Sequence, residues 1–260
     1  MIGLAQPLAD VVKLFLKEIV LPKIRNVWLF FIAPCIGLTI SLWLWLNTPA
    51  RGSGGTELGI LIIFTIISLG VYPLFLAGWA SNRKFGQLGA LRAIAQTISY
   101  EIRLALVLFR VLALEHTLRN SWRLINRAQH FSLVRPLIIV WAITCVAETN
   151  RTPFDFSEGE SELVSGFNVE FGARAFAVIF IAEYAIILFF RSLTIILFFK
   201  AANRQLIWSA GAVGVSGIWI WLRSTFPRYR YDKLLNLAWK RLLPQAIGIA
   251  VGYSSLTFLN

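Results

Sequence analysis

The feature that most constrains this chain is a series of apolar runs, each long enough or nearly long enough to cross a lipid bilayer. A hydrocarbon layer of about 30 Å needs about 20 helical residues. The chain is also 57% hydrophobic and only 15% charged, whereas soluble domains are about a quarter charged. We therefore expect an all-α membrane protein of one domain, 1–260, with about seven transmembrane helices within 27–258. Hydropathy places them near 27–46, 58–79, 97–115, 134–147, 174–199, 205–222 and 239–258.

Residues 4–17 precede the first span and predict an amphipathic helix that lies on the membrane surface. Its apolar side chains recur at helical spacing, while Asp10, Lys13 and Lys17 share the opposite face. The segment is too short and too charged to cross a bilayer, and Pro22 ends it before the first span. We expect this helix to rest at the interface between lipid and water.

Alternation of the seven spans puts four polar segments on one side of the membrane: the N-terminus, 80–96, 148–173 and 223–238. These segments carry much of the Lys and Arg that gives the chain its net charge of +12, which predicts that they face the matrix or cytoplasm. Four arginines in the opposite loop count against this orientation: Arg119, Arg123, Arg127 and Arg135. Because most basic residues flank apolar spans, the charge does not indicate nucleic-acid binding.

An acidic loop, residues 148–173, contrasts with the basic character of the chain. Between Glu148 and Glu170 there are six acids and one base, Arg151, so the local charge is −6 + 1 = −5. Because like charges two residues apart repel, these acids must be solvated, share protons or pair with cations supplied from elsewhere. Charge alone supports a solvated loop and a functional cluster equally. The acids are Glu148, Asp155, Glu158, Glu160, Glu162 and Glu170.

Two further acids, Glu101 and Glu183, lie within or at the edge of apolar runs. An ionised carboxylate is costly there, so such residues usually carry protons or form a structural ion pair. Arg191 is one candidate partner for Glu183, although eight residues place the two about 80° apart around a helix. In the third span, we expect Arg103 to act as an orientation signal, with Glu101 pointing inward on the other side of the helix.

The sequence contains no cysteine cluster and no glycine-rich phosphate loop. Its two cysteines, Cys35 and Cys145, both lie in apolar runs and are expected in the packed interior. We therefore expect neither a metal site nor a bound cofactor in this chain, and we expect any redox centre to belong to partner subunits.

Four blocks of the sequence together form a pattern typical of one protein family. The strongest runs from Ala147 to Asp155 (AETNRTPFD) and on from Glu158 to Glu170 (EGESELVSGFNVE). The others are 78–101, 223–240 and the N-terminal residues 6–18. These blocks resemble subunit 1 of respiratory complex I, the NADH:ubiquinone oxidoreductase. The resemblance implies a core subunit in the heel of a proton-pumping membrane arm. There, its loops and interfacial helix complete a ubiquinone tunnel beneath two peripheral-arm subunits.

Carried over motif by motif, the resemblance assigns roles to three groups of residues. The quinone tunnel would be bordered by Asp10, Lys13, Arg151, Phe167, Arg228 and Asp232. The loop that couples the tunnel to the membrane interior would contain Glu158, Glu160 and Glu162. The proton path would consist of Glu101, Glu148, Glu170 and Glu183. Ubiquinone would be the substrate, with NADH, FMN and iron–sulfur clusters bound by partner subunits.

The resemblance also shapes what we expect of partners and location. The family has a further helix before the interfacial one, and we expect a separately encoded chain to supply it beside the peripheral-arm and small membrane-arm subunits. Membrane lipids are the other expected partners. We expect the mitochondrial inner membrane, with the bacterial plasma membrane as the alternative. Arg110 and Arg191 stand where the family is normally uncharged.

Three other functions remain open at this stage. The membrane subunit of an energy-converting hydrogenase would share the fold and the buried acids, but would not reduce quinone. A cation-coupled secondary transporter would use buried carboxylates to bind its cation. That class commonly shows inverted repeats and broken helices, and the sequence indicates neither. A noncatalytic scaffold has no reason to keep buried carboxylates at their cost.

Overall fold

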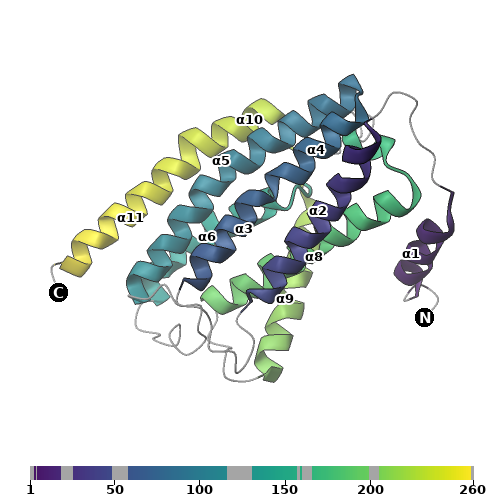
Figure 1. Cartoon of the computed structure of the whole chain (residues 1–260). Helices are drawn as coiled ribbons and strands as arrows, with labels where there is room; N and C mark the ends of the chain where they lie inside the picture. The colour runs from purple at the N-terminus through teal and green to yellow at the C-terminus, as the bar shows by residue number, and fades with distance from the viewer. Residues whose placement is uncertain are drawn as a thin grey trace.

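The structure is a computed structural model that describes residues 3, 5–18, 26–48, 58–115, 131–156, 159, 166–198 and 205–258. Within these residues every regular element is a helix, which confirms the predicted all-α fold (Figure 1). The α-helices are α1 (Gln6–Leu16), α2 (Val27–Leu46), α3 (Gly59–Leu69), α4 (Val71–Ser81), α5 (Lys84–Glu115), α6 (Phe131–Glu148), α8 (Ala173–Phe198), α9 (Gln205–Thr225), α10 (Tyr231–Asn236) and α11 (Leu243–Phe258). A 3₁₀ helix, η2 (Gly166–Glu170), precedes α8, and a π-helical turn, η4 (Leu237–Leu242), joins α10 to α11.

Apart from Leu58, which directly precedes α3, and Gly70, which separates α3 from α4, the described residues of each predicted span lie within one or two of these helices. Among the described residues, three helical stretches are long and apolar enough to cross a membrane: 20 residues of α2, 23 residues of α3 and α4 together, and 26 residues of α8. The apolar part of α6 is shorter, Leu137–Glu148. The charged residues Glu101 and Arg103 lie inside α5, so hydropathy alone describes that helix less well.

The second predicted span, 58–79, is not one continuous helix, because it breaks at Gly70 into α3 and α4. Pro73 explains the break: proline has no N–H to donate to the Leu69 carbonyl, and its ring collides with that carbonyl. The chain instead tightens at this point, and the Gly70 N–H donates to the Ile67 carbonyl at 2.8 Å. Backbone of this kind is tolerated in a membrane only where protein buries it or where it lines a cavity.

The helices pack around a core formed mainly by α2, α5, α6 and α8. Helix α2 lies against α8 and α4, and α5 lies against α4, α6 and α11 (Figure 1). Trp141 of α6 is fully buried, and its indole N–H donates to the Thr194 hydroxyl of α8 at 2.9 Å. Cys145 is buried as expected, but Cys35 is exposed on the outer face of α2, so the prediction that it lies inside was wrong.

The polar segments predicted to share one side of the membrane meet at one end of the helices. The Asn26 N–H donates to the Ala80 carbonyl at 3.3 Å, and the Thr152 hydroxyl donates to the Arg223 carbonyl at 3.3 Å. Helix α1 stands beside the bundle, away from α11, and contacts α8 (Figure 1). Its exposed apolar residues Leu8, Val12 and Leu16 are available to lipid or to another subunit.

The close crossing of α4 and α5 depends on a glycine. A Cβ added at Gly78 would overlap the Ala90 side chain and lie 3.2 Å from the Gly86 carbonyl oxygen. We expect Gly78→Ala to force the two helices apart and to lower the free energy of unfolding by about 1–3 kcal/mol. Thermal unfolding of the purified protein measures this loss. The control is Gly214→Ala on α9, where an added Cβ meets nothing within 4 Å; equal losses for both variants would contradict the packing argument.

Candidate functional site

A partly open cavity of ≈ 100 Å³ is lined by residues of α2, α3, α4, α5, α6 and α8. Residues with small side chains, together with two prolines, line this space and leave it unfilled. They are Pro34 and Gly37 in α2, Gly70 and Pro73 at the break between α3 and α4, and Ala182 in α8. Its wall is largely apolar, but polar groups enter it from α5, α6 and α8. Such a space has room for several water molecules, which need polar partners to stay. The polar lining residues are Thr97, Glu148, Thr149, Asn150 and Glu183.

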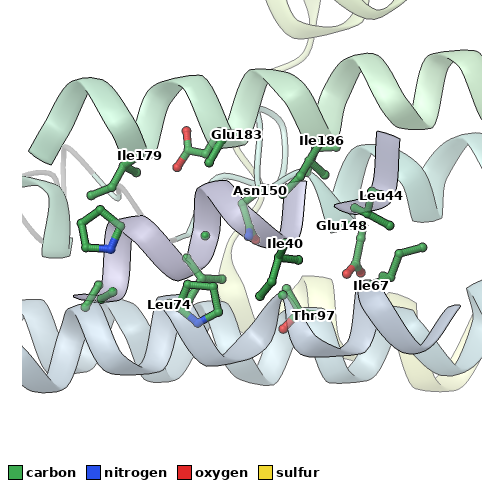
Figure 2. A pocket seen from close by; sticks show the side chains of 18 of the residues that line it. Ile40, Leu44, Ile67, Leu74, Thr97, Glu148, Asn150, Ile179, Glu183 and Ile186 are labelled. Atoms are coloured by element: carbon green, nitrogen blue, oxygen red, sulfur yellow. The ribbon is translucent and has the colours of Figure 1, made fainter. Parts of the chain in front are cut away.

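Two carboxylates line this cavity at different points along its length. Glu183 projects from α8, and Glu148 stands at the end of α6 near Thr97 and Ile67 (Figure 2). Asn150 lies between them in that view (Figure 2). Polar groups spaced along one cavity can be joined by hydrogen-bonded water, and such water chains carry protons.

Glu183 is held by Arg151, which comes from the loop after α6. The Arg151 Nη2 lies 2.8 Å from the Glu183 Oε2, and the side chains are only 9% and 23% exposed. The guanidinium also lies over the rings of Phe180 and Tyr184 of α8, 5.4 Å and 5.2 Å from their centres. A charge-assisted hydrogen bond and two aromatic faces therefore fix this loop against α8.

Arg191 was the candidate partner for Glu183 in the sequence, and the structure contradicts that pairing. The Arg191 Nη1 donates to the Ser216 hydroxyl of α9 at 3.0 Å, and its guanidinium lies 5.8 Å from the centre of the Trp219 ring. The angular offset around α8 explains the outcome, because a side chain turned toward α9 cannot reach the cavity side. Arg191 thus links α8 to α9.

The expectation that Arg103 is a mere orientation signal was also wrong. Arg103 is only 1% exposed, its Nη2 donates to the Ser99 carbonyl at 2.6 Å, and its guanidinium lies 3.8 Å from the centre of the Tyr100 ring. Glu101, on the other side of α5, accepts a hydrogen bond from the Ser68 hydroxyl of α3. It therefore points into the protein as expected, but not alone.

The acidic loop is tied to the segment that precedes α10. Asp155 pairs with Arg228 at 3.4 Å, and the Tyr229 N–H donates to the Pro153 carbonyl at 3.0 Å. Tyr229 also packs on Phe154 with ring centres 5.7 Å apart. The two segments that the sequence assigned to a single polar face are thus in direct contact.

Other predicted residues lie at the margin of this region. Asp10 and Lys13 are exposed on α1, and Asp232 pairs with Arg230 at 3.2 Å with both side chains largely exposed. Glu170 lies 3.7 Å from Arg83. Helix α1 is anchored through Arg174, whose Nε donates to the Phe15 carbonyl at 3.2 Å. The structure does not bring these residues to the cavity. They lie instead around the end of the helices where the polar segments meet.

Tyr231 is the first residue of α10 and lies in this polar region, where its ring contacts both an arginine and an aromatic side chain. The Arg92 guanidinium lies 5.7 Å from the centre of the Tyr231 ring, and Phe156 packs edge-on against it. Burial raises the pKa of the Tyr231 hydroxyl, an effect that Arg92 partly offsets. The phenol therefore stays protonated at neutral pH.

Three predicted residues and the side chain of a fourth fall outside what the structure describes. Glu158, Glu160 and Glu162 of the coupling loop lie beyond the described residues, as does the side chain of Phe167. Their roles stay predictions.

Sequence reasoning missed the polar groups that join α5 to α6. The Gln96 side-chain amide donates to the Ala147 and Phe154 carbonyls at 2.7 Å and 2.9 Å, which fixes the residues on either side of Glu148. Tyr100 is fully buried under Arg103. The spacing contained a signal, since residues three apart on a helix share a face, as Tyr100 and Arg103 do.

The buried ion pair generates a prediction about stability. Arg151→Met leaves Glu183 without this cation, and we expect a loss of about 3–5 kcal/mol in unfolding free energy. Adding Glu183→Gln should recover part of that loss, because no unpaired charge remains. Chemical denaturation of the purified protein measures both. Arg230→Met is the control, because its exposed pair with Asp232 contributes at most about 1 kcal/mol; similar losses for Arg151→Met and Arg230→Met would refute the prediction.

Comparison with known proteins agrees with this picture. A family model described as NADH dehydrogenase matches residues 1–253. NADH-ubiquinone oxidoreductase chain 1 of Branchiostoma lanceolatum is 45% identical over 258 residues, which cover 95% of this chain and 80% of the relative. The protein of the same name from Aedes aegypti is 44% identical over 248 residues, which cover 94% and 79%. That of Myrmecophaga tridactyla is 45% identical over 266 residues, which cover 97% and 83%.

Agreement in sequence extends over nearly the whole chain, and the helical membrane fold and the buried acids are consistent with it. The chain therefore belongs to the NADH dehydrogenase family, together with these relatives named NADH-ubiquinone oxidoreductase chain 1.

Proposed function

We propose that this chain is a core membrane subunit of a proton-pumping NADH:ubiquinone oxidoreductase, and that it couples quinone reduction to proton transfer through buried carboxylates. The names of its relatives support the enzyme and its substrate. The single observation that carries the coupling is the pair formed by Arg151 and Glu183. Arg151 belongs to the residues expected around the quinone, and Glu183 to those expected on the proton path.

This pair gives quinone chemistry a direct electrostatic route into the membrane. Quinone gains two electrons and two protons to become quinol, so negative charge builds up near the tunnel until protons arrive. A guanidinium shared between that charge and Glu183 responds by weakening its bond to the carboxylate. Glu183 then binds a proton more tightly, and it releases that proton when Arg151 returns.

The cavity supplies the next steps of the proposed path. Water in the cavity would join Glu183 to Glu148, and Glu148 lies within electrostatic reach of Glu101. Glu170, paired with Arg83 at the polar end, would stand at the entrance. The acids Glu158, Glu160 and Glu162 complete the proposal as the loop that responds to quinol formation.

We also propose which residues border the quinone and which subunits surround this chain. Asp10, Lys13, Phe167, Arg228 and Asp232 would border the quinone with Arg151, under the peripheral-arm subunits that hold FMN, the iron–sulfur clusters and the NADH site. Small membrane-arm subunits and lipid would cover the apolar flanks. The animal origin of the relatives supports the mitochondrial inner membrane.

Glu183→Gln tests the coupling step. We expect the variant complex to lose most proton translocation, because the amide binds Arg151 but cannot carry a proton. Quinone reduction should slow in parallel. The decrease should be about 10²–10⁴-fold if proton transfer becomes rate-limiting. Proton uptake into proteoliposomes and NADH oxidation measure the two rates. Glu18→Gln, at an exposed acid, should change neither; unchanged pumping in Glu183→Gln would refute the path.

Purification of the native complex tests the assignment itself. We expect NADH oxidation with short-chain ubiquinone to co-purify with this chain and to stop with a tunnel-blocking inhibitor. Mass spectrometry of the preparation should identify the flavin and iron–sulfur subunits. If the chain purifies with hydrogenase subunits instead, or if quinone reduction does not follow it, the assignment is wrong.

A further inference from the structure

Arg103 is a buried cation in the middle of α5 that the proposed proton path does not use. Only 1% of the residue is exposed, and it is among the largest fully buried side chains in the described part of the protein. An unbalanced charge in such a position is costly, and in membrane proteins buried cations almost always pair with acids or backbone carbonyls. Its surroundings therefore need a compensating charge.

The contacts of Arg103 satisfy only part of its guanidinium. Nη2 donates to the Ser99 carbonyl, and the Tyr100 ring covers one face. Its buried Nε and Nη1 have no hydrogen-bond partner among the described residues. Across from α5, the buried Oε2 of Glu148 is likewise without a partner within the described residues. Two donors and one acceptor, each unsatisfied, are the groups that bridging water would connect.

The charged and titratable groups around Arg103 come from a small number of elements. Glu148 at the end of α6 interacts electrostatically with both Arg103 and Glu101. Tyr100 on α5 interacts with Arg103 and also with Tyr229 in the segment before α10, while Cys145 on α6 interacts with Glu148. In η4, which also packs on α5, Trp239 donates to the Ser99 hydroxyl at 3.3 Å, while Lys240 and Arg241 are exposed.

We propose that Arg103 is a positioning residue for the proton path: a fixed counter-cation that keeps the pair formed by Glu101 and Glu148 at one ionised and one protonated carboxyl. One cation, one anion and one neutral acid give this cluster no net charge, which is its least costly state away from water. Without Arg103, the lowest-energy state is two protonated acids.

This role rests on the proposed proton path and makes it more specific. A pair that holds one proton can both accept and release a proton, as a relay must. A pair that holds two protons can release a proton but cannot accept one. Release is also costly, because it leaves a buried carboxylate without a compensating charge. Arg103 thus sets the pH range over which the pair passes protons.

The test compares Arg103→Met with the wild-type complex in two ways. In the resting complex, infrared spectroscopy should detect one more protonated carboxyl in Arg103→Met than in the wild type. The double variant Arg103→Met with Glu148→Gln should lack this additional carboxyl. During turnover, the pH profile of proton translocation should move to higher pH by about 1–3 units, the size of effect that a nearby opposite charge has on a carboxyl. Arg103→Lys keeps the charge and should stay near the wild-type profile.

Arg191→Met is the matched control, since it removes another membrane arginine whose contacts are with Ser216 and Trp219. It should add no protonated carboxyl and should not shift the profile. The proposal is overturned if Arg103→Met has the wild-type carboxyl signal and the wild-type pH profile. Because the infrared measurement needs no turnover, this failure is distinct from a failure of quinone reduction in the native complex.

Assembly gives an independent test if Arg103→Met accumulates poorly. Arg103→Met with Glu148→Gln leaves a single acid in the cluster. Because fewer acids then lack a counter-cation, the double variant should assemble to a greater extent than Arg103→Met alone. Native gel electrophoresis of solubilised membranes measures this. If the double variant assembles no better than Arg103→Met, Arg103 has only a packing role and the proposal is wrong.

Discussion

The ion pair between Arg151 and Glu183 is the interaction on which the polar end of this protein depends. It fixes the loop after α6 against α8, and that loop is fixed in turn to the segment before α10 through Asp155 and Arg228. Because one member of the pair comes from the loop and the other from a membrane helix, neither can move without exposing a charge at low dielectric. The pair therefore joins the polar loop directly to a membrane helix.

Interrupted helices create the second requirement, a space that water can enter. Pro34 lies inside α2, Gly70 and Pro73 lie at the break between α3 and α4, and all three line the cavity. Each proline removes one backbone hydrogen bond of a helix, and a membrane protein tolerates such backbone where protein buries it or where it lines a cavity. The cavity that these residues line also contains Glu183 and Glu148 (Figure 2).

Hydropathy predicted the helices well because each span buries its own backbone and depends little on its neighbours. The acids within the membrane helices were also found from sequence, since Glu101 and Glu183 stand out in apolar runs. Their partners were not: Arg151 lies 32 positions from Glu183, and only the packing of the loop on α8 brings them together. The break at Gly70 was missed because hydropathy does not register the lost N–H of Pro73, and Arg103 was misjudged because burial depends on the neighbouring α6.

The most direct test of coupling is to exchange the two charges, with Arg151→Glu and Glu183→Arg in one complex, and to measure protons translocated per NADH oxidised. The exchanged pair preserves the attraction but moves the carboxyl from α8 to the loop. Our account predicts that the double variant assembles better than either single variant yet translocates few protons, because position 183 no longer carries an acid. Recovery of wild-type proton translocation would show that the pair is purely structural and would contradict the account.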